Sequence, residues 1–281
     1  MGFREAVGDL MKSFSPTDVY TNRSKKFRNV VGFYSVKENS GVTTLVVNTA
    51  YLLASTGKSV LVIDFHLNHP GCFRYLIPDM LSDEKVGKLK TINDKLINSG
   101  VPLPEFAQLT MIKGVFLLTA SPDELVDKYC NINEDYVDRI FSEAASIYDY
   151  VLVDMDEDMR YETTTSAIRN CDFIYTIISP QPECVEMVAK NNYTVYNAGF
   201  GDVFKFIIQN MVRDSNVTEI IKAMELQGVM SIPYCEAVRK IGDNYRLFVS
   251  GTFGDDVSSI KYIECVKQLA AHIKKIGDGV G

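Results

Sequence analysis

From residue 30 onward, short runs of β-branched and apolar residues alternate with stretches whose apolar residues fall three and four positions apart. Most of the short runs are continuously apolar rather than alternating, which is typical of strands covered on both faces. The runs are Val30–Val36, Ser59–Asp64, Val115–Thr119, Tyr150–Asp154, Phe173–Ser179, Val203–Gln209 and Val229–Ile232. This alternation predicts a parallel sheet flanked by helices, with functional loops at the carboxyl ends of the strands.

The stretches between the runs are typical of amphipathic helices. Thr43–Ser55, Glu134–Ile147 and Cys184–Tyr196 carry the helical spacing, and a tail from Ile260 to Ile276 carries it again. We therefore expect an α/β fold, a doubly wound and mostly parallel sheet of roughly seven to eight strands flanked by helices. Residues 30–281 show no linker, internal repeat or low-complexity tract, so we expect them to form one domain.

Residues 1–29 form an N-terminal extension outside this pattern. Phe3, Val7, Leu10 and Phe14 would share one face of a short helix. A basic cluster follows: Arg23, Lys25, Lys26 and Arg28. Two interpretations stay open, because the helix either packs on its own domain or docks onto a partner or a membrane surface. A helix this short offers little apolar area for membrane anchoring alone.

Composition narrows the class of protein. The 281 residues include 29 Lys and Arg against 36 Asp and Glu, a net charge of −7. With 46% apolar and 23% charged residues, the chain is not mostly disordered. No apolar stretch reaches the ~18 residues of a spanning helix, and the absence of an apolar signal core predicts a cytoplasmic protein. The acidic balance argues against a constitutive nucleic-acid binder.

One loop has the position of a phosphate-binding loop. Val30–Val36 leads into Lys37-Glu38-Asn39-Ser40-Gly41-Val42-Thr43-Thr44, where a helix begins. A strand, a tight loop and a helix N-terminus present backbone N–H groups and the helix dipole to an anion. A Walker-type loop ends in Gly-Lys-Ser/Thr. Gly41 and Thr43 stand in place here, but Val42 occupies the lysine position.

This loop resembles the deviant Walker A motif of the ParA/MinD family of P-loop ATPases, whose pattern is K-G-G-x-G-K-T-T. The matching residues are the signature lysine, the last glycine and the two threonines: Lys37, Gly41, Thr43 and Thr44. Glu38 and Asn39 replace glycines, and Val42 replaces the lysine that meets the phosphates.

Later segments resemble further motifs of the same family, in the same order. They are Gly57–Asp64 (second strand), Tyr148–Asp154 (Walker B strand), Ile178–Glu183 (the next strand and loop), Asn210 (the asparagine that reads adenine) and Ile232–Val238 (the penultimate segment). Asp64 matches the first aspartate of the second strand, but His66 stands where the second aspartate is expected. The resemblance covers roughly residues 30 to 275.

The resemblance implies a P-loop NTPase-like fold with ATP and magnesium as cofactors. The implied nucleotide-binding residues are Lys37, Ser40, Gly41, Thr43, Thr44, Asn210 and Pro233. The implied magnesium residues are Thr43, Asp64 and Asp154, with the aspartates acting through waters. Purely structural roles stay open, because Thr43 can simply start the helix and Asp154 can end a strand.

Three substitutions weaken the implied chemistry. Val42 removes a cation whose charge-assisted hydrogen bond contributes about 1.5–3 kcal/mol, so nucleotide affinity should be roughly ten- to hundredfold lower. Glu38 adds an anion to the loop, and His66 replaces the carboxylate that would orient the attacking water. Lys37, reaching across a dimer to a partner's phosphates, is the one remaining catalytic candidate that the resemblance supplies.

The resemblance leads to a positioning or recruitment protein with a degenerate nucleotide site. As a dimeric pseudo-ATPase it would serve a pilus, conjugation or segregation apparatus, like the atypical TadZ/CpaE-like members. Its partners would be a second copy and a protein of that machine, which would recruit it to the membrane or a cell pole. The alternative is an active ATPase that cycles with a partner, including ATP-dependent DNA partition through Arg239, Lys240 and Arg246.

Two other motifs are expected to carry no chemistry. His66 and His69 lie three residues apart without a cysteine or carboxylate at matching spacing, so we do not expect them to be metal ligands. Met155-Asp156-Glu157-Asp158 is expected to be a solvated loop rather than a pair of catalytic carboxylates.

Overall fold

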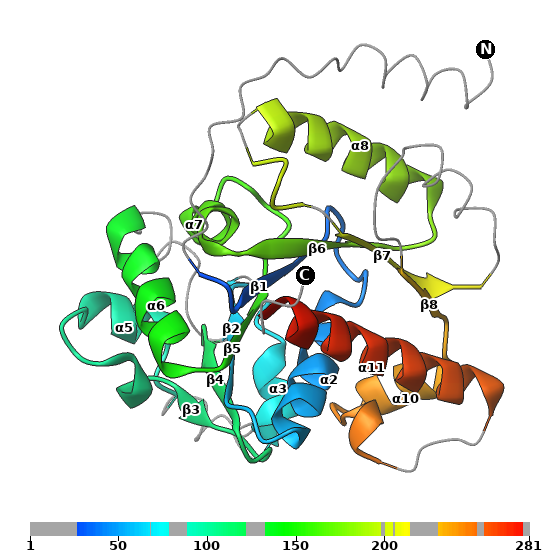
Figure 1. The fold of residues 1–281 in the computed structure, drawn as a ribbon, viewed down its shortest axis with the longest axis horizontal. Helices are drawn as coiled ribbons and strands as arrows, with labels where there is room; N and C mark the ends of the chain where they lie inside the picture. The colour runs from blue at the N-terminus through cyan, green and yellow to red at the C-terminus, as the bar shows by residue number, and fades with distance from the viewer. Residues whose placement is uncertain are drawn as a thin grey trace.

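The computed structural model describes residues 27–67, 69–78, 89–121, 133–197, 200–204, 206–213, 230–251 and 256–277. Its centre is an eight-stranded sheet in the order β3-β4-β2-β5-β1-β6-β7-β8 (Figure 1). All neighbouring strands pair in parallel except β3, which pairs antiparallel with β4 at the sheet edge. The predicted doubly wound α/β fold is therefore confirmed.

The strands coincide closely with the apolar runs of the sequence. Their bounds are β1 Val30–Tyr34, β2 Val60–Asp64, β3 Gln108–Leu109, β4 Val115–Thr119, β5 Tyr150–Asp154, β6 Phe173–Ile178, β7 Phe206–Val212 and β8 Met230–Pro233. Every residue of β1, β2, β5 and β6 is buried, as the continuous apolar runs predict for central parallel strands. The edge strand β3 has no counterpart among the predicted runs.

Helices cover both faces of the sheet (Figure 1). They are α2 Val42–Ser55, α3 Cys72–Leu76, α5 Ile92–Ile97, α6 Glu134–Ile147, α7 Glu162–Asn170, α8 Pro182–Asn197, α10 Glu236–Gly242 and α11 Val257–Gly277, with 3-10 turns η2 Leu103–Glu105 and η4 Phe248–Ser250. One apolar layer packs α6, α7 and α8 against the sheet, and the other packs α2, α3 and α11. The sheet thus separates two hydrophobic cores.

Sheet register brings two predicted site residues together. β2 and β5 are neighbours, and Asp64 at the end of β2 lies directly opposite Asp154 at the end of β5. β1 lies between β5 and β6. The chain continues from β1 to β2 on one side of β1, and later crosses from β5 to β6 on its other side. Such a switch point opens a crevice at the carboxyl ends of the strands, and the loop after β1 lies there.

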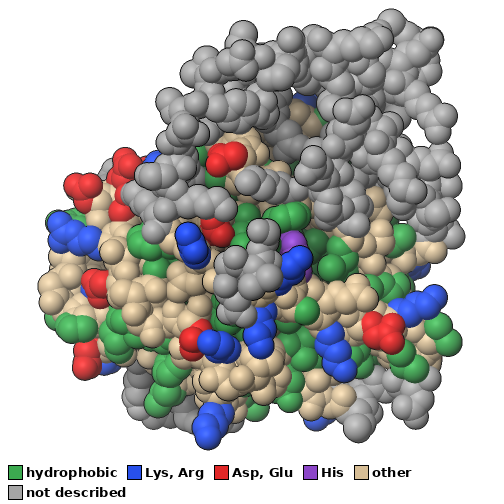
Figure 2. Space-filling model, viewed as in Figure 1, with side chains coloured by type: hydrophobic (Ala, Val, Ile, Leu, Met, Phe, Trp, Pro, Cys, Tyr) green, Lys and Arg blue, Asp and Glu red, His purple; other side chains and the backbone are tan. Residues whose placement is uncertain are grey.

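The surface is mixed in charge on the face shown in Figure 2, where small apolar groups lie between charged side chains. The tail predicted to be an amphipathic helix is α11, which buries Val266, Leu269 and Ile273 and exposes its lysines. Within the described residues, no helix combines the length and apolar character needed to cross a membrane. The predicted N-terminal helix lies outside the described residues, so its role stays a prediction.

Candidate nucleotide site

The loop between β1 and α2 has the backbone of an anion cradle. Asn39 and Gly41 adopt left-handed conformations, with φ of 59° and 83°. A Cβ at Gly41 would lie 2.5 Å from Asn210 Nδ2, so glycine suits this position for both backbone and space. The first turn of α2 has no side-chain cap and no acidic residue. The first N–H groups of α2 and the positive end of its dipole therefore stay available to an anion.

Asn210 holds the loop between β1 and α2 in place through its side-chain amide. It lies in β7, 4% exposed, and its Nδ2 donates a hydrogen bond to the Ser40 carbonyl oxygen at 2.8 Å. Ser40 Oγ in turn donates to the Lys37 carbonyl oxygen at 2.8 Å. The resemblance implies that Asn210 reads adenine, which stays a prediction; in this structure its amide nitrogen contacts the phosphate loop.

Thr43 and the two aspartates form the deepest corner of the site. Thr43 Oγ1 donates a hydrogen bond to Asp154 Oδ2 at 2.7 Å. Asp64 accepts hydrogen bonds from the backbone N–H groups of His66, Gly71 and Cys72 at 3.1, 2.9 and 2.9 Å. Both aspartates are fully buried. Burial, followed by repulsion from Asp154, raises the pKa of Asp64 to about 7, and burial also raises the pKa of Asp154.

This corner fits magnesium in its donor set. Asp154 Oδ1 is buried without a hydrogen-bond partner among the described residues, and a divalent cation would satisfy such an oxygen. Thr43, Asp154 and Asp64 would hold the ion with oxygen donors, as magnesium prefers. The ion would supply charge neutralisation to a bound phosphate.

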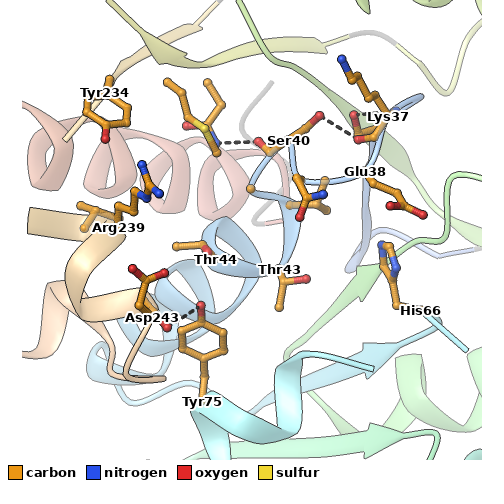
Figure 3. Close-up of a pocket in the computed structure, with 18 of the residues that line it drawn as sticks. Lys37, Glu38, Ser40, Thr43, Thr44, His66, Tyr75, Tyr234, Arg239 and Asp243 are labelled. Atoms are coloured by element: carbon orange, nitrogen blue, oxygen red, sulfur yellow. Dashed lines mark hydrogen bonds between the residues drawn. The ribbon is translucent and has the colours of Figure 1, made fainter. Parts of the chain in front are cut away.

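The loop itself carries little positive charge toward the cavity. Val42 is only 7% exposed and packs its side chain into the core beneath α2. Lys37 Nζ donates a hydrogen bond to Gln181 Oε1, and in Figure 3 its amine is directed away from Thr43. Glu38 is exposed at the mouth of the site. Neither position 42 nor Lys37 therefore directs an amine toward Thr43.

His66 lies among carboxylates rather than in solvent. Burial by itself lowers the pKa of His66, but Asp154, Asp64, Asp156 and Glu157 together outweigh burial and raise that pKa. His66 Nδ1 lies 4.0 Å from Glu157 Oε2. Asp156 is only 1% exposed, so the loop after β5 is not fully solvated as the sequence suggested.

A cavity of about 890 Å³ unites these parts. All seven predicted nucleotide-binding residues line it, together with Val42 and His66. Side chains that the sequence did not assign to this site line its other side: Tyr75, Tyr234, Arg239, Asp243 and Tyr245. The Arg239 side chain extends from α10 and lies between Tyr234 and Thr44 (Figure 3). Sequence reasoning placed Arg239 in a DNA-binding patch, because nothing local shows that α10 folds over the loop.

A phosphate-loop backbone, a threonine hydroxyl bonded to a buried aspartate and a cavity at the switch point are the arrangement of a P-loop NTPase-like fold. The AAA_31 family, described as an AAA domain, matches residues 28–185, and the chain belongs to it. The resemblance to ParA/MinD ATPases is confirmed by this match and by solved structures of the same fold.

Three solved structures illustrate the likeness. The septum site-determining protein MinD of Pyrococcus horikoshii OT3, in complex with Mg-ADP, is 18% identical with a TM-score of 0.71, covering 88% of this chain and 96% of that chain. A ParA family ATPase of Chlorobium tepidum TLS is 20% identical with a TM-score of 0.67, covering 87% and 99%. MinD in the MinC:MinD cell division complex of Aquifex aeolicus is 19% identical with a TM-score of 0.64, covering 86% and 96%. No curated protein matches the sequence.

Proposed function

We propose that this protein is a ParA/MinD-like positioning or recruitment protein that acts as a dimeric scaffold with a degenerate nucleotide site. Its task is to place a larger machine, such as a pilus, conjugation or segregation apparatus. One observation carries the proposal: Val42 buries an apolar side chain where the phosphate lysine would stand, while Lys37 is bound to Gln181. A phosphate-binding loop that lacks this lysine supports weak nucleotide binding or none.

The residues that remain define what the site can still do. The loop N–H groups from Gly41 to Thr44 would bind phosphate oxygens, and Pro233 lines the opposite part of the same cavity. Thr43, Asp64 and Asp154 would hold magnesium. When the His66 ring is protonated, it has no acceptor nitrogen. His66 then cannot orient a water molecule as an aspartate does. ATP hydrolysis should therefore be slow even when ATP is bound.

A scaffold of this kind needs partners. Support comes from the MinD of Aquifex aeolicus, whose structure is that of a MinC:MinD complex. We infer that this chain pairs with a second copy through the face around Lys37 and binds one protein of the machine it positions. That protein would bring it from the cytoplasm to the membrane or a cell pole, with the N-terminal extension as a second point of contact.

The alternative is an active ATPase that cycles with its partner, including in DNA partition. Two observations favour it: Thr43 still contacts Asp154 at 2.7 Å, and Arg239 places a cation in the same cavity. Arg239 would then serve the nucleotide rather than DNA, which leaves Lys240 and Arg246 as the DNA-facing candidates.

Calorimetry of the full chain with ATP and ADP, each with and without magnesium, separates the two functions. The scaffold predicts weak binding, phosphate release close to background and a dimer in sedimentation without nucleotide. Thr43→Val is the matched control, because it keeps the shape of the side chain and removes the magnesium-binding hydroxyl. Turnover that Thr43→Val abolishes would overturn the scaffold and establish the ATPase. A monomer at high concentration, with and without ATP, would overturn the dimeric scaffold.

A further inference from the structure

A second group of potential ligands lies beside the threonine–aspartate corner. The ligand atoms of His66, Asp156 and Glu157 all lie within 4.8 Å of one another. His66 Nδ1 and Glu157 Oε2 are 4.0 Å apart, which is too long for a hydrogen bond. Metal–ligand bonds of roughly 2.0–2.2 Å place two ligands of one ion up to about 4.4 Å apart. The group therefore needs only small side-chain adjustments to enclose an ion.

The backbone fixes both segments that carry these ligands. His66 N donates to Asp64 Oδ1 at 3.1 Å, directly after β2. Met155 N donates to the Phe33 carbonyl oxygen at 3.0 Å, and Tyr34 Oη donates to the Glu157 carbonyl oxygen at 3.1 Å. Asp156 Oδ1 accepts from the Asp158 backbone N–H at 2.8 Å. These backbone contacts hold the two segments, and the bond to Asp156 Oδ1 orients one ligand side chain, as hydrogen bonds do in known metal sites.

Buried carboxylates belong both to this group and to the ends of the two strands that precede it. Asp64, Asp154 and Asp156 are 0%, 0% and 1% exposed. Asp154 Oδ1, two residues before Asp156, is buried and has no hydrogen-bond partner in the part of the chain that the structure describes. The lysine position of the loop holds Val42, which offers no compensating charge. Buried carboxylates are ordinarily paired with cations, bound to metals or protonated, and a bound dication would let this cluster keep its negative charge.

We propose that His66, Asp156 and Glu157 bind a first-row transition-metal dication of the Zn²⁺ or Mn²⁺ class. One imidazole nitrogen with two carboxylates suits such an ion, whereas magnesium prefers oxygen donors alone. The ligands of this site belong to the loops that follow β2 and β5, whereas the magnesium corner uses Thr43 and the strand-end residues Asp64 and Asp154. The ion places positive charge in the phosphate cavity that Val42 leaves without a lysine. This inference does not depend on nucleotide binding or on the scaffold function.

The test titrates the chelator-treated full chain with ZnCl₂ in a calorimeter, without nucleotide and in the presence of excess magnesium. We expect one zinc per chain. Glu157→Gln and His66→Gln should each weaken binding at least about tenfold. The matched control is His69→Gln, which alters the other histidine lining the cavity and should bind zinc like the unmodified chain. Glu157 is partly exposed, so its isosteric variant tests the site even where the His66 variant is unstable.

Cobalt gives a second readout, because its visible spectrum reports ligand type. A nitrogen- and oxygen-bound Co²⁺ spectrum that is lost in Glu157→Gln supports the site. A thiolate charge-transfer band would place the ion on a cysteine, such as Cys72 in the neighbouring Asp64–Cys72–Asp154 group, and would overturn the proposal. Absence of zinc binding tighter than about 100 μM, equal affinity in both site variants, or displacement by excess magnesium would overturn it as well.

Discussion

The two sides of the phosphate cavity use their polar residues differently. At the carboxyl ends of β2 and β5, Asp64 and Asp154 are buried and bonded to the Thr43 hydroxyl and to backbone N–H groups. On the loop side, Val42 is packed in the core and Lys37 contacts Gln181 at the surface. The contacts at the strand ends stabilise the fold itself. The loop side lacks the positive charge that would bind a phosphate.

Under the proposed function, this contrast explains how a nucleotide site can keep its shape while its affinity for nucleotide falls. The cradle is maintained by contacts that the fold needs in any case, such as that between Asn210 and the Ser40 carbonyl. Val42 packs into the apolar core, so the folded state does not require a cation at this position. Shape and charge are therefore separable here, and each can be altered alone.

The largest expected effect comes from restoring the charge. Val42→Lys combined with Glu38→Gly returns the phosphate cation and removes the loop anion, so ATP with magnesium should bind roughly ten- to hundredfold tighter. Calorimetry measures this directly. Val42→Met with Glu38→Gly is the control, because methionine matches an unbranched chain without its charge. A folded lysine variant that binds no tighter than the methionine variant would show that the cradle does not accept phosphate.

The next effect is a pH dependence of stability on the carboxylate side. The unfolded chain releases the Asp64 proton near a pKa of 3.8, whereas burial beside Asp154 raises the folded pKa to about 7. Folding therefore retains a proton in this window, and the stabilisation present below about pH 4 is lost as the pH rises toward 7. We expect the free energy of unfolding to fall by on the order of 1–2 kcal/mol between pH 5 and pH 7.

Urea unfolding in the presence of a chelator measures this slope. Asp154→Asn removes the neighbouring charge, so its slope should be shallower than that of the unmodified chain. The raised pKa of His66 acts in the same direction, and His66→Gln gives the size of that contribution. Stability that increases from pH 5 to pH 7 would contradict the assignment of a protonated Asp64.

A smaller effect tests whether Asn210 positions the loop. Asn210→Ala removes its hydrogen bond to the Ser40 carbonyl, so the free energy of unfolding should fall by about 0.5–1.5 kcal/mol. Ser40→Ala is the comparison, since it keeps the carbonyl that Asn210 contacts. If Asn210 instead serves only the base of a nucleotide, Asn210→Ala would leave the stability of the nucleotide-free chain unchanged and weaken ATP binding alone.

Much of the sheet could be predicted, because central parallel strands are continuous apolar runs. β2 and β5 end at the predicted aspartates, and their register follows from the fold. The predicted Val203–Gln209 run begins three residues before β7, because Val203 is buried although it precedes the strand. β3 has only two residues and pairs antiparallel at an edge, so it leaves no apolar run to detect.

The site was predictable along the loop but not across the cavity. The phosphate-loop residues share one segment, and their spacing carries the signal. Arg239 reaches the cavity from α10, and Asp156 is buried in the loop after β5 although most of its neighbours in the sequence are acidic. Both are consequences of tertiary packing between segments far apart in the sequence, which local polarity does not encode.

The smallest expected effect on stability concerns Lys37. Its amine contacts the neutral Gln181 at the surface, and exposed contacts of this kind contribute little. Lys37→Met should therefore change the free energy of unfolding by less than about 0.5 kcal/mol, in urea titrations beside Gln181→Ala. If Lys37 reaches a partner's phosphates, the same variant should weaken ATP-dependent dimerisation at least about tenfold in sedimentation equilibrium, whereas Gln181→Ala should not. Equal dimerisation in both variants would confine Lys37 to its own protomer, and a loss above about 1 kcal/mol in the monomer would show that the loop side is structural too.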